Sequence, residues 1–147
     1  MRSVPPLLCV ALVLLAAAWR EPQTQTFAKK SVTIHFKCET DGGATVTIKP
    51  WKRNLDARTD YIEWTLVVAN PELAPDSVLI APKSVNSWPF ATKFPITVKK
   101  SSPGVAQGIP SAVPGATYKY SVTGICNVPG MPPDTVVIDP DMIIPGH

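Results

Sequence analysis

The sequence predicts an all-β fold, and more specifically a Greek-key sandwich of about seven strands. Short runs rich in Val, Ile, Thr and Tyr alternate apolar and polar residues with a period of two, whereas no stretch shows a helical period. Pro and Gly, 17 and 8 residues respectively, interrupt these runs at the spacing typical of turns between short strands. Strands with one apolar face must bury it, so two sheets packed face to face are expected.

The first two predicted strands, 31–38 and 44–49, carry this alternation clearly. The residues between them, Asp41-Gly42-Gly43, are typical of a tight turn because glycine tolerates the backbone angles that such turns require. An antiparallel hairpin is therefore predicted at the start of the domain.

The remaining elements follow in order along the chain. The other predicted strands are 61–68, 77–80, 93–99, 117–126 and 134–144. The last of these is broken by Pro140, which cannot donate to a ladder. The Pro-rich segment 103–114 is too long for a tight hairpin and is expected to cross from one sheet to the other. The residues predicted to face the core in the clearest strands are Val32, Ile34, Phe36, Cys38, Ala44, Val46, Ile48, Ile62, Trp64, Leu66, Val68, Phe94, Ile96, Val98, Tyr118, Tyr120, Val122, Gly124 and Cys126.

The N-terminus has the layout of a secretory signal peptide. Arg2 precedes an apolar run from Leu7 to Leu15, and Ala16-Ala17-Ala18 supply the small residues at which cleavage is expected. A membrane anchor is the alternative, but a spanning helix needs roughly 20 apolar residues and Trp19-Arg20-Glu21 interrupts this run. The predicted division is a signal peptide (1–18), a flexible N-terminal extension (19–30) and the sandwich domain (31–147). We therefore expect a secreted or periplasmic protein with no membrane span after cleavage.

The charge of the chain does not favour nucleic acid as a partner. The formal net charge is only +3, and the basic doublets Lys29-Lys30 and Lys99-Lys100 are far apart in the sequence and not interleaved with aromatic residues. Both doublets are interpreted as solvated strand ends.

The two cysteines of the mature chain predict a disulfide. By alternation Cys38 and Cys126 both face the core, and export places them in an oxidising compartment. Closing so long a loop contributes roughly 4 kcal/mol in the chain-entropy model. The alternative is that Cys126 is a metal thiolate.

Several motifs occur in an order that resembles the cupredoxins. They are an Asp-x-x-x-Trp strand, a Pro-Gly turn, a Tyr-x-Tyr strand and a short final strand. The segments that carry the resemblance are 48–51, 60–66, 87–90, 114–122 and 137–144. The sequence is similar in particular to secreted bacterial proteins that keep the cupredoxin-like fold without a blue-copper site. The resemblance implies a cupredoxin-like sandwich.

The copper ligands of that family are incomplete here. Blue copper requires two imidazoles and a thiolate, usually with a weak axial thioether. The resemblance places Cys126 and Met131 in the region of the thiolate and the thioether, but no histidine lies between them or in 67–71. His35 and His147 are the only histidines of the chain. We expect no cofactor and no metal site, with copper at Cys126 and Met131 as the alternative.

Catalytic residues are not expected either. A Ser-His-Asp triad would have to recruit His35 from the polar face of a strand or the terminal His147, and no G-x-S-x-G motif is present. Asp139 and Asp141 alone supply too few oxygens for calcium. The protein is therefore predicted not to be an enzyme.

The candidates for a binding surface are aromatic. Trp51 and Trp88 neighbour prolines in loop-like segments, and we expect them to cover the open end of the barrel. The alternative is a surface contact, because exposed tryptophans near prolines can bind a protein or a cell-surface polymer.

Three functions stay open from the sequence. The preferred one is a secreted, non-catalytic binding or structural domain. A copper electron-transfer protein is the second. The third is an immunoglobulin- or fibronectin-like adhesion module, because residues 112–118 resemble the turn before a fibronectin F strand. Against the third, Cys126 follows Tyr118 by eight residues instead of the Tyr-x-Cys step.

Overall fold

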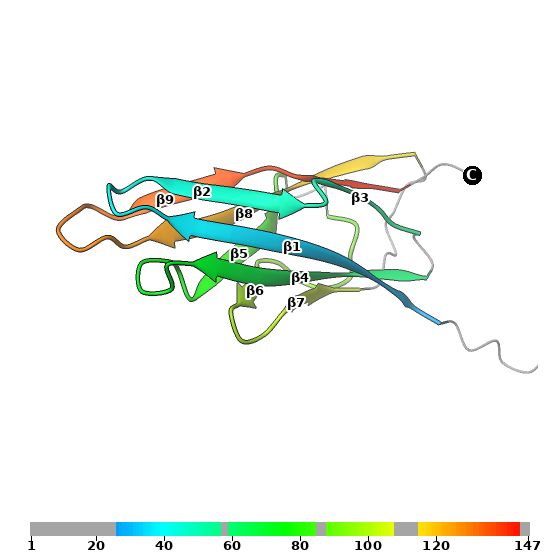
Figure 1. Cartoon of the computed structure of the whole chain (residues 1–147). Helices are drawn as coiled ribbons and strands as arrows, with labels where there is room; N and C mark the ends of the chain where they lie inside the picture. The colour runs from blue at the N-terminus through cyan, green and yellow to red at the C-terminus, as the bar shows by residue number, and fades with distance from the viewer. Residues whose placement is uncertain (1–25, 57–58, 85–87, 108–114, 145–147) are drawn as a thin grey trace, which may run out of the picture.

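The structure, a computed structural model, describes residues 26–56, 59–84, 88–107 and 115–144. In this part of the chain ten strands form two sheets, and no helix is present (Figure 1). The strands are β1 (Ala28–Cys38), β2 (Ala44–Lys49), β3 (Lys52–Asn54), β4 (Asp60–Ala69), β5 (Ser77–Pro82), β6 (Ile96–Lys99), β7 (Gly104–Ala106), β8 (Thr117–Cys126), β9 (Asp134–Ile138) and β10 (Asp141–Ile143). The predicted all-β class is confirmed.

The first sheet has the order β2-β1-β4-β7. β1 and β2 form the predicted antiparallel hairpin around Asp41-Gly42-Gly43, where Gly42 has a φ of +92°. On its other side β1 runs parallel to β4, from the pair Ala28–Asp60 to the pair Lys37–Ala69 (Figure 1). β7 completes the sheet by antiparallel pairing with β4.

The second sheet has the order β3-β10-β8-β5-β6, and β9 also pairs with β8. β9 and β10 are the two halves of the predicted strand 134–144, and they pair with opposite ends of β8. Pro140 lies between them, and its carbonyl accepts a hydrogen bond from the Tyr120 N–H at 3.2 Å. The segment 103–114 was predicted to cross from one sheet to the other. The strands before and after it, β6 and β8, both belong to the second sheet, and the segment contains β7 of the first sheet, so the chain passes to the first sheet and back.

The core lies between the two sheets and contains residues of both. Trp64 of β4 packs against Tyr120 of β8 with ring centroids 5.6 Å apart, and the backbone of Gly124 lies against the Phe36 ring. All the predicted inward residues of β1 and β8 are buried, so the alternation in these strands is confirmed. The two packed sheets therefore form a β-sandwich.

Phe94 is the exception among the predicted core residues. Its side chain is 41% exposed. The reason is that β6 begins only at Ile96, so the strand alternation does not extend back to Phe94.

The ends and the number of strands also differ from the prediction. The described residues form ten strands rather than about seven, and two of the additional ones, β3 and β7, contain three residues each. β1 begins at Ala28, so residues 28–30 belong to the sheet and not to the predicted flexible extension (19–30). Parallel pairing with β4 orders them, together with ion pairs from Lys29 to Glu63 and from Lys30 to Asp60.

Some predictions concern residues outside the described ranges. The signal peptide (1–18), the extension up to residue 25 and His147 are among them. Over the ranges that the structure does cover, no helix is long and apolar enough to cross a membrane.

Candidate functional site

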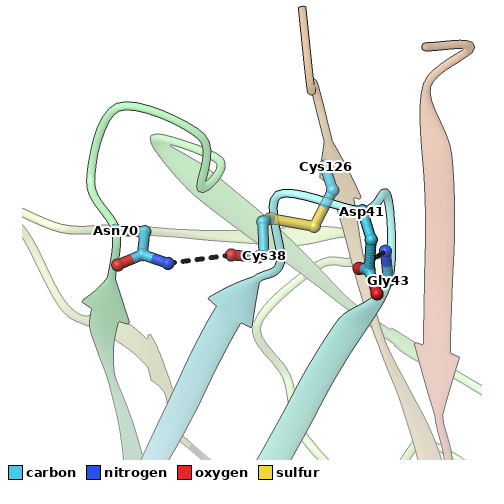
Figure 2. The surroundings of a disulfide bond; sticks show 5 residues. All are labelled: Cys38, Asp41, Gly43, Asn70 and Cys126. Atoms are coloured by element: carbon cyan, nitrogen blue, oxygen red, sulfur yellow. Dashed lines mark hydrogen bonds between the residues drawn. A yellow bond between two sulfur atoms is a disulfide. The ribbon is translucent and has the colours of Figure 1, made fainter.

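The predicted cysteine pair joins the two sheets at one end of the sandwich (Figure 2). Cys38 is the last residue of β1 and Cys126 the last of β8. Their Cα atoms are 5.7 Å apart, within the usual range for a disulfide, and their sulfur atoms lie at bonding distance. Both side chains are buried, as the alternation predicted.

Neighbouring turns support this end of the fold. The Asn70 side-chain amide donates to the Cys38 carbonyl at 3.1 Å, and Asn70 itself has a positive φ of 56°, which asparagine tolerates (Figure 2). In the β1–β2 turn, the Gly43 N–H donates to the Asp41 carboxylate at 3.1 Å. The disulfide therefore lies between two connections that are fixed by hydrogen bonds, the β1–β2 turn and the segment that follows β4 at Asn70.

Met131 lies at the same end as Cys126, beside the β1–β2 turn, and its side chain is 43% exposed. Its Sδ atom is 2.9 Å from the position that a Cβ atom on Gly42 would occupy, so the thioether lies on the β1–β2 turn. His35 is exposed on the outer face of β1. Within the described residues, no group of three or more His, Cys, Asp or Glu side chains is placed to hold a metal ion.

Trp88 covers the core. Its ring stacks on that of Trp64 with centroids 6.5 Å apart, and its indole N–H donates to the Thr92 carbonyl at 2.6 Å. Phe90 and Phe94 pack edge-on against it at 5.1 and 5.9 Å. Trp88 therefore packs against the aromatic part of the core.

Tyr120 forms the polar contact at the centre of this aromatic group. The Trp64 indole N–H donates to the Tyr120 hydroxyl at 3.2 Å, which joins β4 to β8 across the core. Burial raises the pKa of Tyr120 to about 12, although the hydrogen bond from Trp64 acts in the opposite direction. The phenol is therefore neutral at physiological pH and serves the packing of the core.

Trp51, in contrast, is exposed. Its side chain is 45% accessible, and it lies in the connection between β2 and β3. The Trp51 carbonyl accepts a hydrogen bond from the Asp141 N–H at 3.1 Å, which fixes the backbone while leaving the ring in solvent. Of the two tryptophans considered as surface contacts, Trp51 is the one available to a partner.

A basic groove lies next to Trp51. It has a volume of about 530 Å³, and its lining residues are Lys30, Pro50, Lys52, Arg53, Asn54 and Ile143. We refer to these six residues as the basic groove. It is formed where β3, the edge strand of the second sheet, lies near the start of β1 in the first sheet.

The cations of the basic groove differ in their partners. Lys30 forms an ion pair with the buried Asp60 at 3.4 Å. Among the described residues, neither the Lys52 nor the Arg53 side chain forms an ion pair. The Arg53 Nε atom is moreover buried and has no hydrogen-bond partner.

The sequence interpretation missed this groove. Lys52-Arg53 is a basic doublet like the two that were considered, but the third cation, Lys30, is distant in the sequence. Only the pairing of β3 in the second sheet and of β1 in the first brings the three residues to one place. The signal in the sequence was the run Lys49-Pro-Trp-Lys-Arg, in which three cations surround an aromatic residue.

In comparisons with known proteins, no family model, curated protein or solved structure matches the chain.

Proposed function

We propose that this chain is an exported, non-catalytic domain with a cupredoxin-like Greek-key fold, which binds a partner at the cell surface. One observation carries the proposal: the Cys126 sulfur lies at bonding distance from the Cys38 sulfur. In the family that the sequence resembles, a thiolate in this region would be a copper ligand. Here the same sulfur connects two strands, so the domain keeps the framework and uses the cysteine for stability.

The pairing of the strands supports the cupredoxin-like assignment over the immunoglobulin alternative. Immunoglobulin constant domains have sheets of strands A-B-E-D and C-F-G, which are antiparallel. The first sheet of this chain instead has a central parallel pair, β1 with β4. The Asp-x-x-x-Trp and Tyr-x-Tyr segments fall in β4 and β8, and their Trp64 and Tyr120 are in contact.

The alternative of copper electron transfer has less support. The thiolate would have to come from a cysteine that is paired with Cys38, and Met131 packs on Gly42. His35 lies on the outer, exposed face of β1, whereas Cys38 of the same strand faces the core. These side chains would have to rearrange before they could provide the trigonal ligand set of blue copper.

Export is inferred from two features together. Residues 1–18 have the layout of a signal peptide, and disulfides persist in oxidising compartments such as the periplasm or the exterior of the cell. We therefore place the domain outside the cytoplasm, where the partner is a protein or a polymer of the cell surface.

The binding role is tested by sedimentation with cell envelopes of the producing organism. We expect the purified domain to sediment with them, and Trp51→Ala to weaken this binding about tenfold or more, since buried tryptophans dominate many interfaces. Leu79→Ala is the control, because Leu79 is a large apolar residue of β5 with a similar exposed fraction, 42%. A domain that does not sediment, or equal binding by both variants, would contradict the proposal.

A further inference from the structure

The basic groove presents two cations that have no partner among the described residues. Lys52 is exposed and Arg53 is partly buried, and both line the groove. Some lysines near strand ends are paired, Lys29 with Glu63 at 3.0 Å and Lys100 with Asp76 at 3.0 Å, whereas Lys49 and Lys99 form no ion pair with the described residues. The groove is distinguished because two unpaired cations, Lys52 and Arg53, line the same hollow.

The Arg53 side chain gives the groove a specific donor. Buried polar groups nearly always have a hydrogen-bond partner, so the orphaned Nε–H of Arg53 needs an explanation. The adjacent strand offers Asp141, but its Oδ1 atom is likewise buried without a partner, and the two side chains form no ion pair. Arg53 Nε and Asp141 Oδ1 are thus two unpartnered buried atoms on neighbouring strands, and neither is exposed to the groove. The donors that Arg53 can offer to the groove are the terminal guanidinium nitrogens, which form no hydrogen bond with the described residues.

The other residues that line the basic groove are compatible with an anionic ligand. Lys52 supplies a mobile charge at the rim, and the Asn54 side chain can donate from its amide. Pro50 and Ile143 add an apolar surface, and charges act more strongly beside such a surface than in open water. Lys30 contributes less, because Asp60 partly neutralises it.

We propose that the basic groove binds an oxyanion of the partner, a carboxylate or a phosphate group, through Arg53 and Lys52. The planar guanidinium presents parallel N–H donors that match two oxygens of either group, whereas an ammonium offers only a point charge. This inference rests on the proposed binding function and specifies the chemistry of its ligand: an anionic polymer or an anionic patch of the cell surface.

The test is an NMR titration of the folded, disulfide-containing domain, with inorganic phosphate in one arm and acetate in the other. The signals observed are the Arg53 Nε–H and the backbone amides of Lys52 and Asn54. We expect these signals to shift and to saturate with phosphate, with acetate or with both. Saturation with phosphate alone assigns a phosphate ligand, and saturation with acetate assigns a carboxylate ligand.

Two variants and a control make the test specific. Arg53→Gln and Lys52→Gln are each expected to weaken anion binding about tenfold or more, as the loss of a charged hydrogen bond predicts. Lys52 is exposed, so its variant remains informative if Arg53→Gln fails to fold. Lys99→Gln is the matched control, because Lys99 is exposed on β6, the opposite edge of the same sheet.

An Arg53 Nε–H signal that stays unchanged in both arms would overturn the inference. An equal loss of binding in Lys52→Gln and Lys99→Gln would overturn it too, because net charge alone would then explain the effect. If the groove binds no anion while the domain still sediments with envelopes in a Trp51-dependent way, only the groove assignment fails.

Discussion

At the scale of single residues, Gly124 shows how an inward position of β8 is matched to a large side chain of the opposite sheet. Gly124 occupies an inward position of β8, where the pattern calls for an apolar side chain. The Phe36 ring of β1 fills that space: a Cβ atom on Gly124 would lie 2.3 Å from Phe36 Cε2 and 2.7 Å from its Cζ. The missing side chain is therefore a packing requirement.

Gly124→Ala is expected to destabilise the domain by about 1–3 kcal/mol, the usual cost of overpacking a core. The free energy of unfolding from urea denaturation measures this change. Gly43→Ala is the control, because its nearest contact is Asp41 Oδ1 at 3.3 Å in an exposed turn. A Gly124→Ala variant as stable as the Gly43→Ala variant would contradict the packing of β8 on β1.

At the scale of elements, the strands with a long alternating pattern could be predicted, whereas β3 and β7 could not; β10 is equally short but lies within the predicted strand 134–144. β1, β4 and β8 contain ten or eleven residues each, which is enough for the period of two to be recognised. β3 and β7 have three residues each and show no period. Their pairing follows from the position of their neighbours, which the local sequence does not encode.

Predictions of contacts between elements were limited for the same reason. The cysteine pair could be predicted because both residues occupy inward-facing positions in the alternating pattern of long strands. The basic groove could not be predicted, since it depends on β3 and on the parallel pairing that orders the start of β1. Trp88 was interpreted as a loop residue, and its contact with Trp64 requires the position of the β5–β6 connection over the core.

The burial of Tyr120 makes the fold less stable at alkaline pH. Burial raises the pKa of Tyr120 to about 12, so in the folded state the phenol keeps its proton where an unfolded tyrosine, with a pKa of about 10, loses it. Above pH 10 the unfolded state therefore binds fewer protons, and this contribution to stability is lost as the pH rises from about 10 to about 12.

Tyr120→Phe is expected to reduce this alkaline decline, measured as the free energy of unfolding at pH 9 and pH 11. At neutral pH the variant should be less stable by about 1–3 kcal/mol, because the buried Trp64 N–H loses its acceptor. Tyr61→Phe, at a half-buried position on β4, is the control. The same alkaline decline in Tyr120→Phe and in the unmodified domain would show that Tyr120 is not the group responsible.

At the scale of the whole molecule, two sheets are connected covalently at one end and by aromatic packing in the core. The disulfide closes a separation of 88 residues, which in the chain-entropy model stabilises the fold by roughly 4–5 kcal/mol. If Cys126 were a copper thiolate instead, the two sheets would lack this covalent connection. Whether the cysteine is structural or metal-binding therefore decides between the two accounts of the protein.

The intact mass of the exported protein, recorded together with a Cu(II) titration, tests that choice most directly. We predict a mature chain that begins at Trp19 and weighs two hydrogens less than the reduced form, with no intense thiolate-to-copper absorption on addition of Cu(II). Two free thiols together with such an absorption would contradict the account.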